Sequence, residues 1–230
     1  MKRSIIILHG AVLSACMLLS CTGMNIAGGG NSSGTGNGAI VCAASDRIEG
    51  VTRPMARVLL YSRDWMPLLD SGTFSDSSRA DDSGKFTFAD VPHGYYDLII
   101  FSVGEKGAGI FKNVPCQPAV TWADTIDTLK EPGFLHGYET SAQNDTLALS
   151  YIYIKGTPFH AMTDTRGEFL MGPLPPSGYT FQIYGLFTTN AGGPVKAIPN
   201  LSAQGTLAGG AITDSIPVII YPDSIVQLAR

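Results

Sequence analysis

Hydrophobic and polar residues alternate over short stretches of this chain, and the alternation predicts β-strands joined by tight turns. The segment 85–88, Lys-Phe-Thr-Phe, alternates polar and aromatic residues, as a strand with one buried face does. The segment 82–84, Asp-Ser-Gly, predicts a turn before it, because aspartate can cap its own backbone and glycine tolerates positive φ. After a second turn at 91–94, every second residue from Tyr96 to Ile100 is apolar and falls on one strand face.

The same pattern occurs a second time, from Asp164 to Ile183, 83 residues after the first and without a gap. The shared positions are the turn residues and the residues expected to face inward, whereas the outward positions differ. The matching pairs are Asp81 and Asp164, Gly84 and Gly167, Phe86 and Phe169, Phe88 and Met171, Val91 and Leu174, Pro92 and Pro175, Tyr96 and Tyr179, Leu98 and Phe181, and Ile100 and Ile183. A repeat that keeps only turns and packing residues indicates a duplicated fold unit.

Further β-prone segments surround each copy of the repeat, and no segment beyond the N-terminus predicts a helix of more than two turns. The additional predicted strands are 39–43, 56–61, 109–114, 146–154 and 216–221, while 120–129 closes the first domain and 134–137 starts the second. The segments 46–54 and 70–83 are polar and predict a connection and a long exposed loop. Glu131-Pro132-Gly133 marks a boundary. We therefore expect an all-β chain of two tandem antiparallel β-sandwiches, 39–130 and 131–230. The first core should contain Val58, Phe86, Phe88, Val91, Tyr96 and Leu98.

The N-terminus has the features of a secretory signal with a lipid-attachment site. Lys2 and Arg3 precede a largely apolar segment, 5–19, which is too short to favour a transmembrane helix. The sequence Leu-Leu-Ser-Cys that ends at Cys21 resembles the lipobox of bacterial lipoproteins, whose cysteine receives a diacylglyceryl group. The resemblance implies a signal peptide at 1–20 and lipidation of Cys21. A second fair lipobox ends at Cys16, the alternative site.

Residue 22 and the segment after it bear on where the protein is delivered. Thr22 follows Cys21 where aspartate would favour the inner membrane, so the lipoprotein resemblance implies the outer membrane. Residues 21–38 are rich in glycine, serine and asparagine, which predicts a flexible linker with a reach of roughly 20–25 Å.

The first sandwich resembles the carboxypeptidase-regulatory-like, or transthyretin-like, family. The family pattern Ala-x-Val-x-Leu corresponds to 56–60, Asp-x-x-Gly-x-Phe-x-Phe to 81–88, and Val-Pro-x-Gly-x-Tyr-x-Leu to 91–98. In the second sandwich the resemblance is clear over 164–183, where Ser177 stands in place of the glycine. The resemblance implies an immunoglobulin-like or transthyretin-like sandwich, and such domains act as spacers, adhesion modules and additions to larger proteins.

Composition argues against several classes of function. Without Lys2 and Arg3 the chain has 13 basic and 19 acidic residues, a net charge of −6, and it has no basic cluster for nucleic acid. His93, His136 and His160 are far apart in sequence, so no zinc motif is formed and no metal or cofactor is expected. The match to Gly-x-Ser-x-Gly at 30–34 lies in the glycine-rich linker and not in a nucleophile elbow, so no hydrolase is expected. The aspartates of the 81–84 and 164–167 turns are expected to cap the turns, with calcium binding as the alternative.

Two features leave alternatives open. Cys42 and Cys116 remain after export and form either a disulfide or two buried thiols. The apolar segment 64–69 either covers one end of the first sandwich or forms an exposed recognition patch.

The expected function is non-catalytic: a lipid-anchored surface protein that serves adhesion, scaffolding or partner binding at the outer membrane. The partner would be a surface protein or a polysaccharide, with the membrane contacted through the lipid. The alternative is a carbohydrate-binding module, which would need exposed aromatic rings in one plane. The candidate aromatic residues are Trp65, Tyr95, Trp122, Tyr138 and Tyr184.

Overall fold

The computed structural model describes residues 37–67, 73–141, 150–188, 195–207, 212–220 and 226–227. All of these belong to one compact unit, Ser33–Arg230. Cys16, Cys21 and most of the linker lie outside the described residues, so lipidation stays a prediction. Among the described residues, the one helical segment is η2 (Val103–Glu105), and none is long and apolar enough to cross a membrane.

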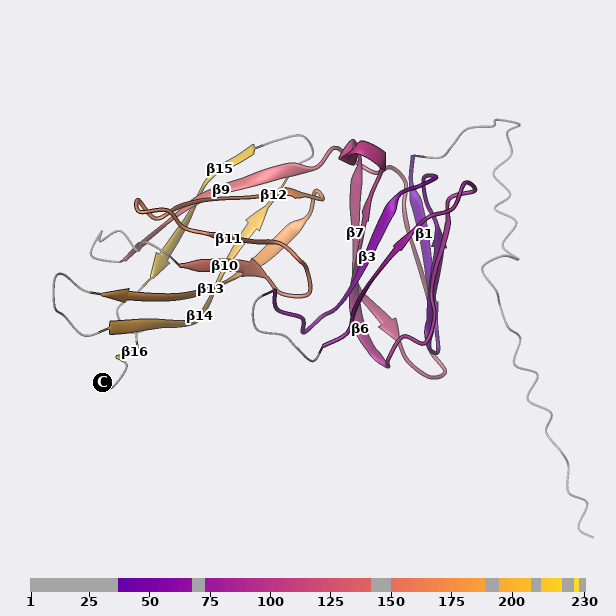
Figure 1. Ribbon diagram of the computed structural model, residues 1–230, viewed down its shortest axis with the longest axis horizontal. Helices are drawn as coiled ribbons and strands as arrows, with labels where there is room; N and C mark the ends of the chain where they lie inside the picture. The colour runs from indigo at the N-terminus through magenta and orange to yellow at the C-terminus, as the bar shows by residue number, and fades with distance from the viewer. Residues whose placement is uncertain are drawn as a thin grey trace, which may run out of the picture. The chain divides into compact units, whose positions relative to one another are not determined.

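The first sandwich consists of two four-stranded antiparallel sheets (Figure 1). One sheet has the order β5-β2-β1-β8, and the other has the order β4-β3-β6-β7. The strands are β1 (Ala39–Ala44), β2 (Arg47–Val51), β3 (Arg57–Ser62), β4 (Ser75–Arg79), β5 (Lys85–Phe88), β6 (Gly94–Phe101), β7 (Ala108–Cys116) and β8 (Thr121–Ile126).

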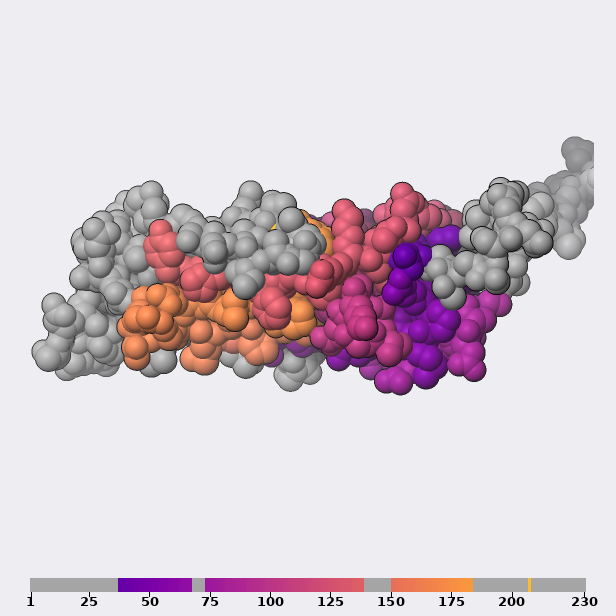
Figure 2. Space-filling model, turned by 90° about the horizontal axis from the view of Figure 1, so that it is seen from above, coloured from indigo at the N-terminus to yellow at the C-terminus, as the bar shows by residue number. Residues whose placement is uncertain are grey.

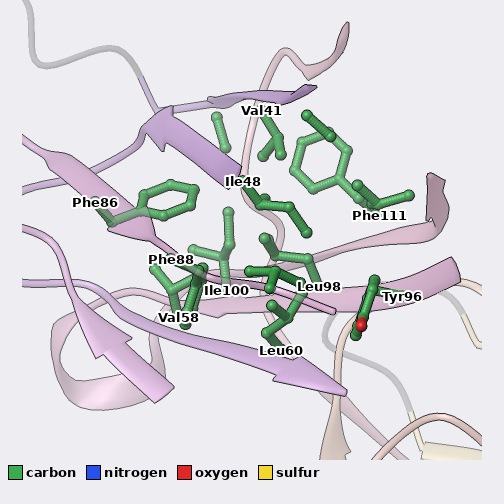
Figure 3. Close-up of a cluster of buried hydrophobic side chains, with 14 of the residues drawn as sticks. Val41, Ile48, Val58, Leu60, Phe86, Phe88, Tyr96, Leu98, Ile100 and Phe111 are labelled. Atoms are coloured by element: carbon green, nitrogen blue, oxygen red, sulfur yellow. The ribbon is translucent and has the colours of Figure 1, made fainter. Parts of the chain in front are cut away.

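The core of the first sandwich is made of the residues that the alternation predicts. Figure 3 shows side chains from both sheets pointing toward one another. Within β5, the rings of Phe86 and Phe88 lie 6.2 Å apart, measured between centroids. The six predicted core residues are all buried, together with Val41, Ile48, Leu60, Ile100, Phe111 and Val114. Each large buried side chain contributes on the order of 1.5–3 kcal/mol, so this cluster is the main source of stability.

The second sandwich has a five-stranded sheet, β11-β10-β13-β14-β16, and a three-stranded sheet, β12-β9-β15. The strands are β9 (Gly133–Ser141), β10 (Tyr151–Ile154), β11 (His160–Met162), β12 (Glu168–Leu174), β13 (Gly178–Thr188), β14 (Val195–Thr206), β15 (Ile212–Ile220) and β16 (Val226–Gln227). Its core contains Leu135, Ile152, Ile154, Phe169, Met171, Leu174, Tyr179, Phe181, Ile183 and Leu207. The inward residues of the second repeat copy are thus buried, as predicted.

The two repeat copies have the same turn geometry. Asp81 Oδ1 accepts hydrogen bonds from the backbone N–H groups of Ser83 and Lys85, at 2.8 Å each. Asp164 Oδ1 accepts from the N–H groups of Arg166 and Glu168, at 2.8 and 2.9 Å. The glycines of both turns adopt positive φ, 82° at Gly84 and 77° at Gly167.

A tyrosine in each copy fixes the second turn. The Tyr96 hydroxyl donates to the carbonyl oxygen of Pro92 at 2.5 Å, and the Tyr179 hydroxyl donates to that of Pro175. Burial raises the pKa of Tyr96 to about 12 and also raises the pKa of Tyr179 strongly, so both hydroxyls keep their protons.

Two expectations about strands were wrong. The 46–54 segment contains β2, and the 70–83 segment contains β4, which pairs with β3 from Arg57↔Arg79 to Tyr61↔Ser75. β4 is a polar edge strand held by backbone pairing, so it lacks the alternation that would reveal it. The sheets are also not purely antiparallel, because β15 pairs with β9 in parallel.

Candidate functional site: the junction between the sandwiches

Strand β6 is buried on both of its faces. Tyr96, Leu98 and Ile100 belong to the first core. The alternate residues Ile99 and Phe101 point to the other face of the sheet and are also buried, with 0% and 2% of their surface exposed. A second covering layer must therefore lie on the outer face of this sheet.

The second sandwich provides apolar cover for that face. Ile99, Phe101 and Ala108 form a cluster that packs against Leu59, Tyr61, Ile110 and Phe159. The rings of Phe101 and Phe159 meet edge to face, with 6.4 Å between centroids and 82° between planes. Ile110 packs against both this cluster and the second core. In Figure 2 the residues of the first sandwich lie directly against those of the second.

Polar contacts surround this apolar cluster. The Lys112 ammonium donates to the carbonyl oxygen of Gly178 and lies 4.5 Å from the ring centroid of Tyr179. Lys155 forms an ion pair with Asp64 at 2.6 Å. The Lys112 side chain thus joins strand β7 of the first sandwich to the beginning of β13 in the second.

The segment after β3 makes most of the remaining contacts. The N–H of Gly156 donates to the carbonyl oxygen of Trp65 at 2.8 Å, and the Tyr153 hydroxyl donates to Met66 Sδ at 3.5 Å. The described part of the 64–69 segment therefore belongs to the junction: Trp65 packs on Tyr61 of the first sandwich, and its carbonyl oxygen accepts from Gly156 of the second. Residues 68 and 69 lie outside the described residues.

A buried carboxyl group lies in the junction. Asp97 is 8% exposed, and its Oδ1 accepts a hydrogen bond from the N–H of Asn113 at 2.9 Å. Burial raises the pKa of Asp97, although the Asn113 hydrogen bond and the charges of Lys112 and Arg63 act in the opposite direction. Burial also lowers the pKa of Lys112, against the opposing charge of Asp97.

The structure does not bring the predicted contact residues Trp65, Tyr95 and Trp122 together. Trp65 packs on Tyr61 at the junction, with 4.5 Å between centroids and 52° between planes. Tyr95 is 45% exposed, on β6. Trp122 lies on β8 in the other sheet and packs edge to face on Phe111, against the first core.

No shared plane of aromatic rings joins these residues, so this arrangement does not favour the carbohydrate-binding alternative. Tyr138 is 37% exposed and lies on β9 of the second sandwich. The side chain of Tyr184 is not among those described.

The predicted disulfide between Cys42 and Cys116 is wrong, because Cys116 is a free, buried thiol. Val41 and Ala43 point into the first core, so Cys42 between them points to the opposite face of the sheet. Cys116 is itself part of the core, and its thiol donates to the carbonyl oxygen of Ser45 at 3.0 Å. Strand alternation therefore keeps the two sulfur atoms on different faces.

The remaining chemical candidates have structural roles or are isolated. Within the described ranges, no group of three or more His, Cys, Asp or Glu residues could hold a metal ion. Asp81 and Asp164 are hydrogen-bonded to the backbone of their turns, as expected for turn capping. His160 is exposed and contacts the carbonyl oxygen of Pro158 at 3.0 Å.

Sequence reasoning missed the junction, although one signal was present. The segment 98–101, Leu-Ile-Ile-Phe, is continuously apolar, which is typical of a strand buried on both faces. Alternation alone places Leu98 and Ile100 in the first core and says nothing about what covers Ile99 and Phe101.

Comparison with solved structures finds bacterial pilins at low similarity. The minor pilin GBS52 of Streptococcus agalactiae is 16% identical, with 79% of this chain and 86% of that chain covered and a TM-score of 0.33. The major pilin subunit BcpA of Bacillus cereus is 9% identical, with 80% and 69% covered and a TM-score of 0.32. No protein-family model and no curated protein matches the chain. These similarities are low, so function is argued from the residues of the chain itself.

Proposed function

We propose that this protein is a non-catalytic, lipid-anchored surface protein whose two sandwiches act as one rigid body that scaffolds or binds a partner at the outer membrane. The junction is the observation that carries the proposal. A strand buried on both faces, β6, belongs to one sandwich on one side and to the junction on the other. Bending at the junction would expose Ile99 and Phe101 to water, which opposes independent movement of the two sandwiches.

The polar groups of the junction support a mechanical role. Lys112, Asp64 and the carbonyl oxygen of Trp65 each have a partner in the second sandwich. Such contacts set the orientation of two domains, whereas domains joined by a small polar surface usually move against each other. The chain would thus hold a partner-binding surface in a fixed orientation.

Attachment to the membrane is the second part of the proposal and is supported by the N-terminal sequence. Cys21 in its lipobox would carry the lipid, with Cys16 as the alternative, and Thr22 would direct delivery to the outer membrane. The partner on the surface would be a protein or a polysaccharide, and no nucleic acid would be bound.

Metabolic labelling with a palmitate analogue tests the anchor. The wild type and Cys16→Ser should incorporate label, and Cys21→Ser should not. Loss of label only in Cys16→Ser would move the anchor to Cys16, and full labelling of both variants would remove the lipoprotein proposal.

Distance measurements between spin labels, one on each sandwich, test the rigid body. We expect one narrow distance distribution in the wild type and a broad one in the double variant Phe101→Ser, Phe159→Ser. The matched control is Met162→Ser, which changes an exposed side chain of the second sandwich. A broad distribution in the wild type would contradict a scaffold role.

A further inference from the structure

One end of the first sandwich holds the point where the linker joins the fold, and we name it the linker end. It comprises Asn37 and the turns at 52–56, 81–84 and 102–107. Strand register places them together: Ala39 pairs with Ile126, Ile40 with Val51, Val51 with Lys85, and Arg57 with both Arg79 and Phe101.

Exposed apolar side chains gather at the linker end. Val103 is 65% exposed, Val51 is 43% exposed and Met55 is 41% exposed. The described residues contain seven large exposed hydrophobic side chains, so nearly half of them lie at this one end. Exposed apolar groups that gather in one place mark a contact site more often than scattered ones do.

Two of the turns lie side by side and present these groups outward. The guanidinium of Arg57, the first residue of β3 after the 52–56 turn, donates to Glu105 in the 102–107 turn at 3.1 Å. Arg53, Pro54, Ser102 and Val103 line a shallow hollow between the two turns. A Cβ on Gly104 would find no atom within 4 Å, so the 103–105 segment projects from the fold.

The linker is fixed to the fold at this end. The N–H of Leu129 donates to the carbonyl oxygen of Asn37, and the Arg53 guanidinium donates to its side-chain oxygen. Only 15 residues lie between Cys21 and Asn37, and these 16 steps correspond to a reach of roughly 20–24 Å for a chain of this composition. A lipid on Cys21 would therefore keep the linker end within about this distance of the bilayer.

We propose that the linker end rests on the phospholipid bilayer that holds the anchor, with Met55 and Val103 inserted among the headgroups. The inference depends on the proposed anchoring at Cys21. Two apolar side chains give weak binding alone, but the anchor makes the contact intramolecular, so a weak contact is occupied much of the time.

Charge makes little contribution to this contact. Arg53 and Lys106 at the linker end are offset by the exposed Asp81, Asp82 and Glu105. Bilayer contact should therefore depend on the apolar groups and change little with salt or with the fraction of anionic lipid.

Hydrogen exchange measured by mass spectrometry tests the contact. Lipidated protein in vesicles of phosphatidylethanolamine and phosphatidylglycerol is compared with the unlipidated chain that starts at residue 22. In vesicles, amide exchange over 102–107 should slow several-fold, and exchange over the turn at 90–93, at the opposite end, should not change. Raising the salt concentration should leave the protection in place.

The double variant Met55→Ser, Val103→Ser should lose this protection, and Met162→Ser, Leu170→Ser, with similarly exposed residues in the second sandwich, should keep it. Flotation with the vesicles separates the two proposals. Protein that floats without protection at 102–107 would overturn the bilayer contact and leave the anchor intact. Protein that does not float would overturn both.

Discussion

Gly156 of the second sandwich lies against Asp97 of the first, so closely that a Cβ on the glycine would be 2.8 Å from Asp97 Oδ2. The same Cβ would be 3.2 Å from the carbonyl oxygen of Arg63. Gly156 also adopts φ = 75°, a region that residues with a side chain rarely occupy. Glycine at this position allows the buried carboxyl group and the facing turn to approach each other.

Gly156→Ala should destabilise the protein and loosen the junction. The left-handed backbone alone costs an alanine about 1–2 kcal/mol, and the contact with Asp97 adds to this cost. Urea unfolding would give the change in the free energy of unfolding, and spin-label distances would show the junction.

Gly104→Ala is the matched control, because Gly104 has φ = 70° but open space around it. The free energy of unfolding of this variant should fall only by the cost of the left-handed backbone. Its spin-label distance distribution should match that of the wild type. Equal losses in the two variants would mean that the contact with Asp97 has no energetic importance.

Asp97→Asn should change how stability depends on pH. Because burial raises the pKa of Asp97 above its ordinary value of 3.8, the folded protein holds this proton more tightly than the unfolded chain does. The contribution of Asp97 to the free energy of unfolding should therefore fall as the pH rises from about 4 through the raised pKa. Asparagine has no such titration, so the variant should gain stability relative to the wild type toward neutral pH.

Thermal unfolding at a series of pH values measures this difference. Asp82→Asn, which changes an exposed carboxyl group in the turn at 81–84, is the control for the loss of a carboxyl group outside the junction. A parallel profile for Asp97→Asn would show that the junction is insensitive to this proton.

Tyr96→Phe and Tyr179→Phe should have similar effects, because each removes one hydroxyl that donates to a proline carbonyl oxygen. A hydrogen bond of this kind contributes about 0.5–1.5 kcal/mol. Urea unfolding of each variant measures the loss. Tyr95→Phe, at an exposed neighbouring position, should change little, and a loss there equal to that of Tyr96→Phe would argue against a specific hydrogen bond.

Cys116 should resist alkylation in the folded protein and react after unfolding. Its thiol is buried, and burial raises its pKa to about 11, so little reactive thiolate forms near neutral pH. Mass spectrometry of peptides alkylated before and after denaturation provides the measurement. Rapid labelling of Cys116 in native protein would place it outside the core.

Residues 39–130, expressed alone, should fold but expose a hydrophobic patch, because Ile99 and Phe101 lose the cover that Phe159 helps to provide. The fragment should bind a hydrophobic dye more strongly than the full chain, and Phe101→Ser should reduce that binding. Phe86→Ala should destabilise the fragment by about 3–5 kcal/mol, since this ring lies in the separate first core. A fragment that does not fold would show that the two sandwiches depend on each other.

The sequence predicted best those residues whose role depends only on their neighbours along the chain. Gly84 and Gly167 supply positive φ, Phe86 and Phe169 fill a core, and local spacing alone reveals these roles. The all-β sandwich architecture could be predicted for this reason.

The junction could not be predicted in the same way, because it depends on contacts between distant segments. Phe101 and Phe159 are 58 positions apart, and neither sits in a motif. The disulfide alternative for Cys42 and Cys116 fails for a different reason: Cys42 alternates with the core residues Val41 and Ala43, so its side chain points away from the core that holds Cys116. Backbone-held strands such as β4 leave no side-chain pattern at all.

The parallel pairing of β15 with β9 fixes an order of assembly during synthesis. Every strand of the first sandwich lies between Ala39 and Ile126, so its two sheets can close as soon as that stretch has left the ribosome. In the second sandwich, β9 pairs with β12 along one edge, but its other edge stays unpaired until β15 has been made, whose first partner pair joins Ile212 to Phe134. The first sandwich can therefore be complete before the second. The second sandwich then packs against an outer face that is already folded.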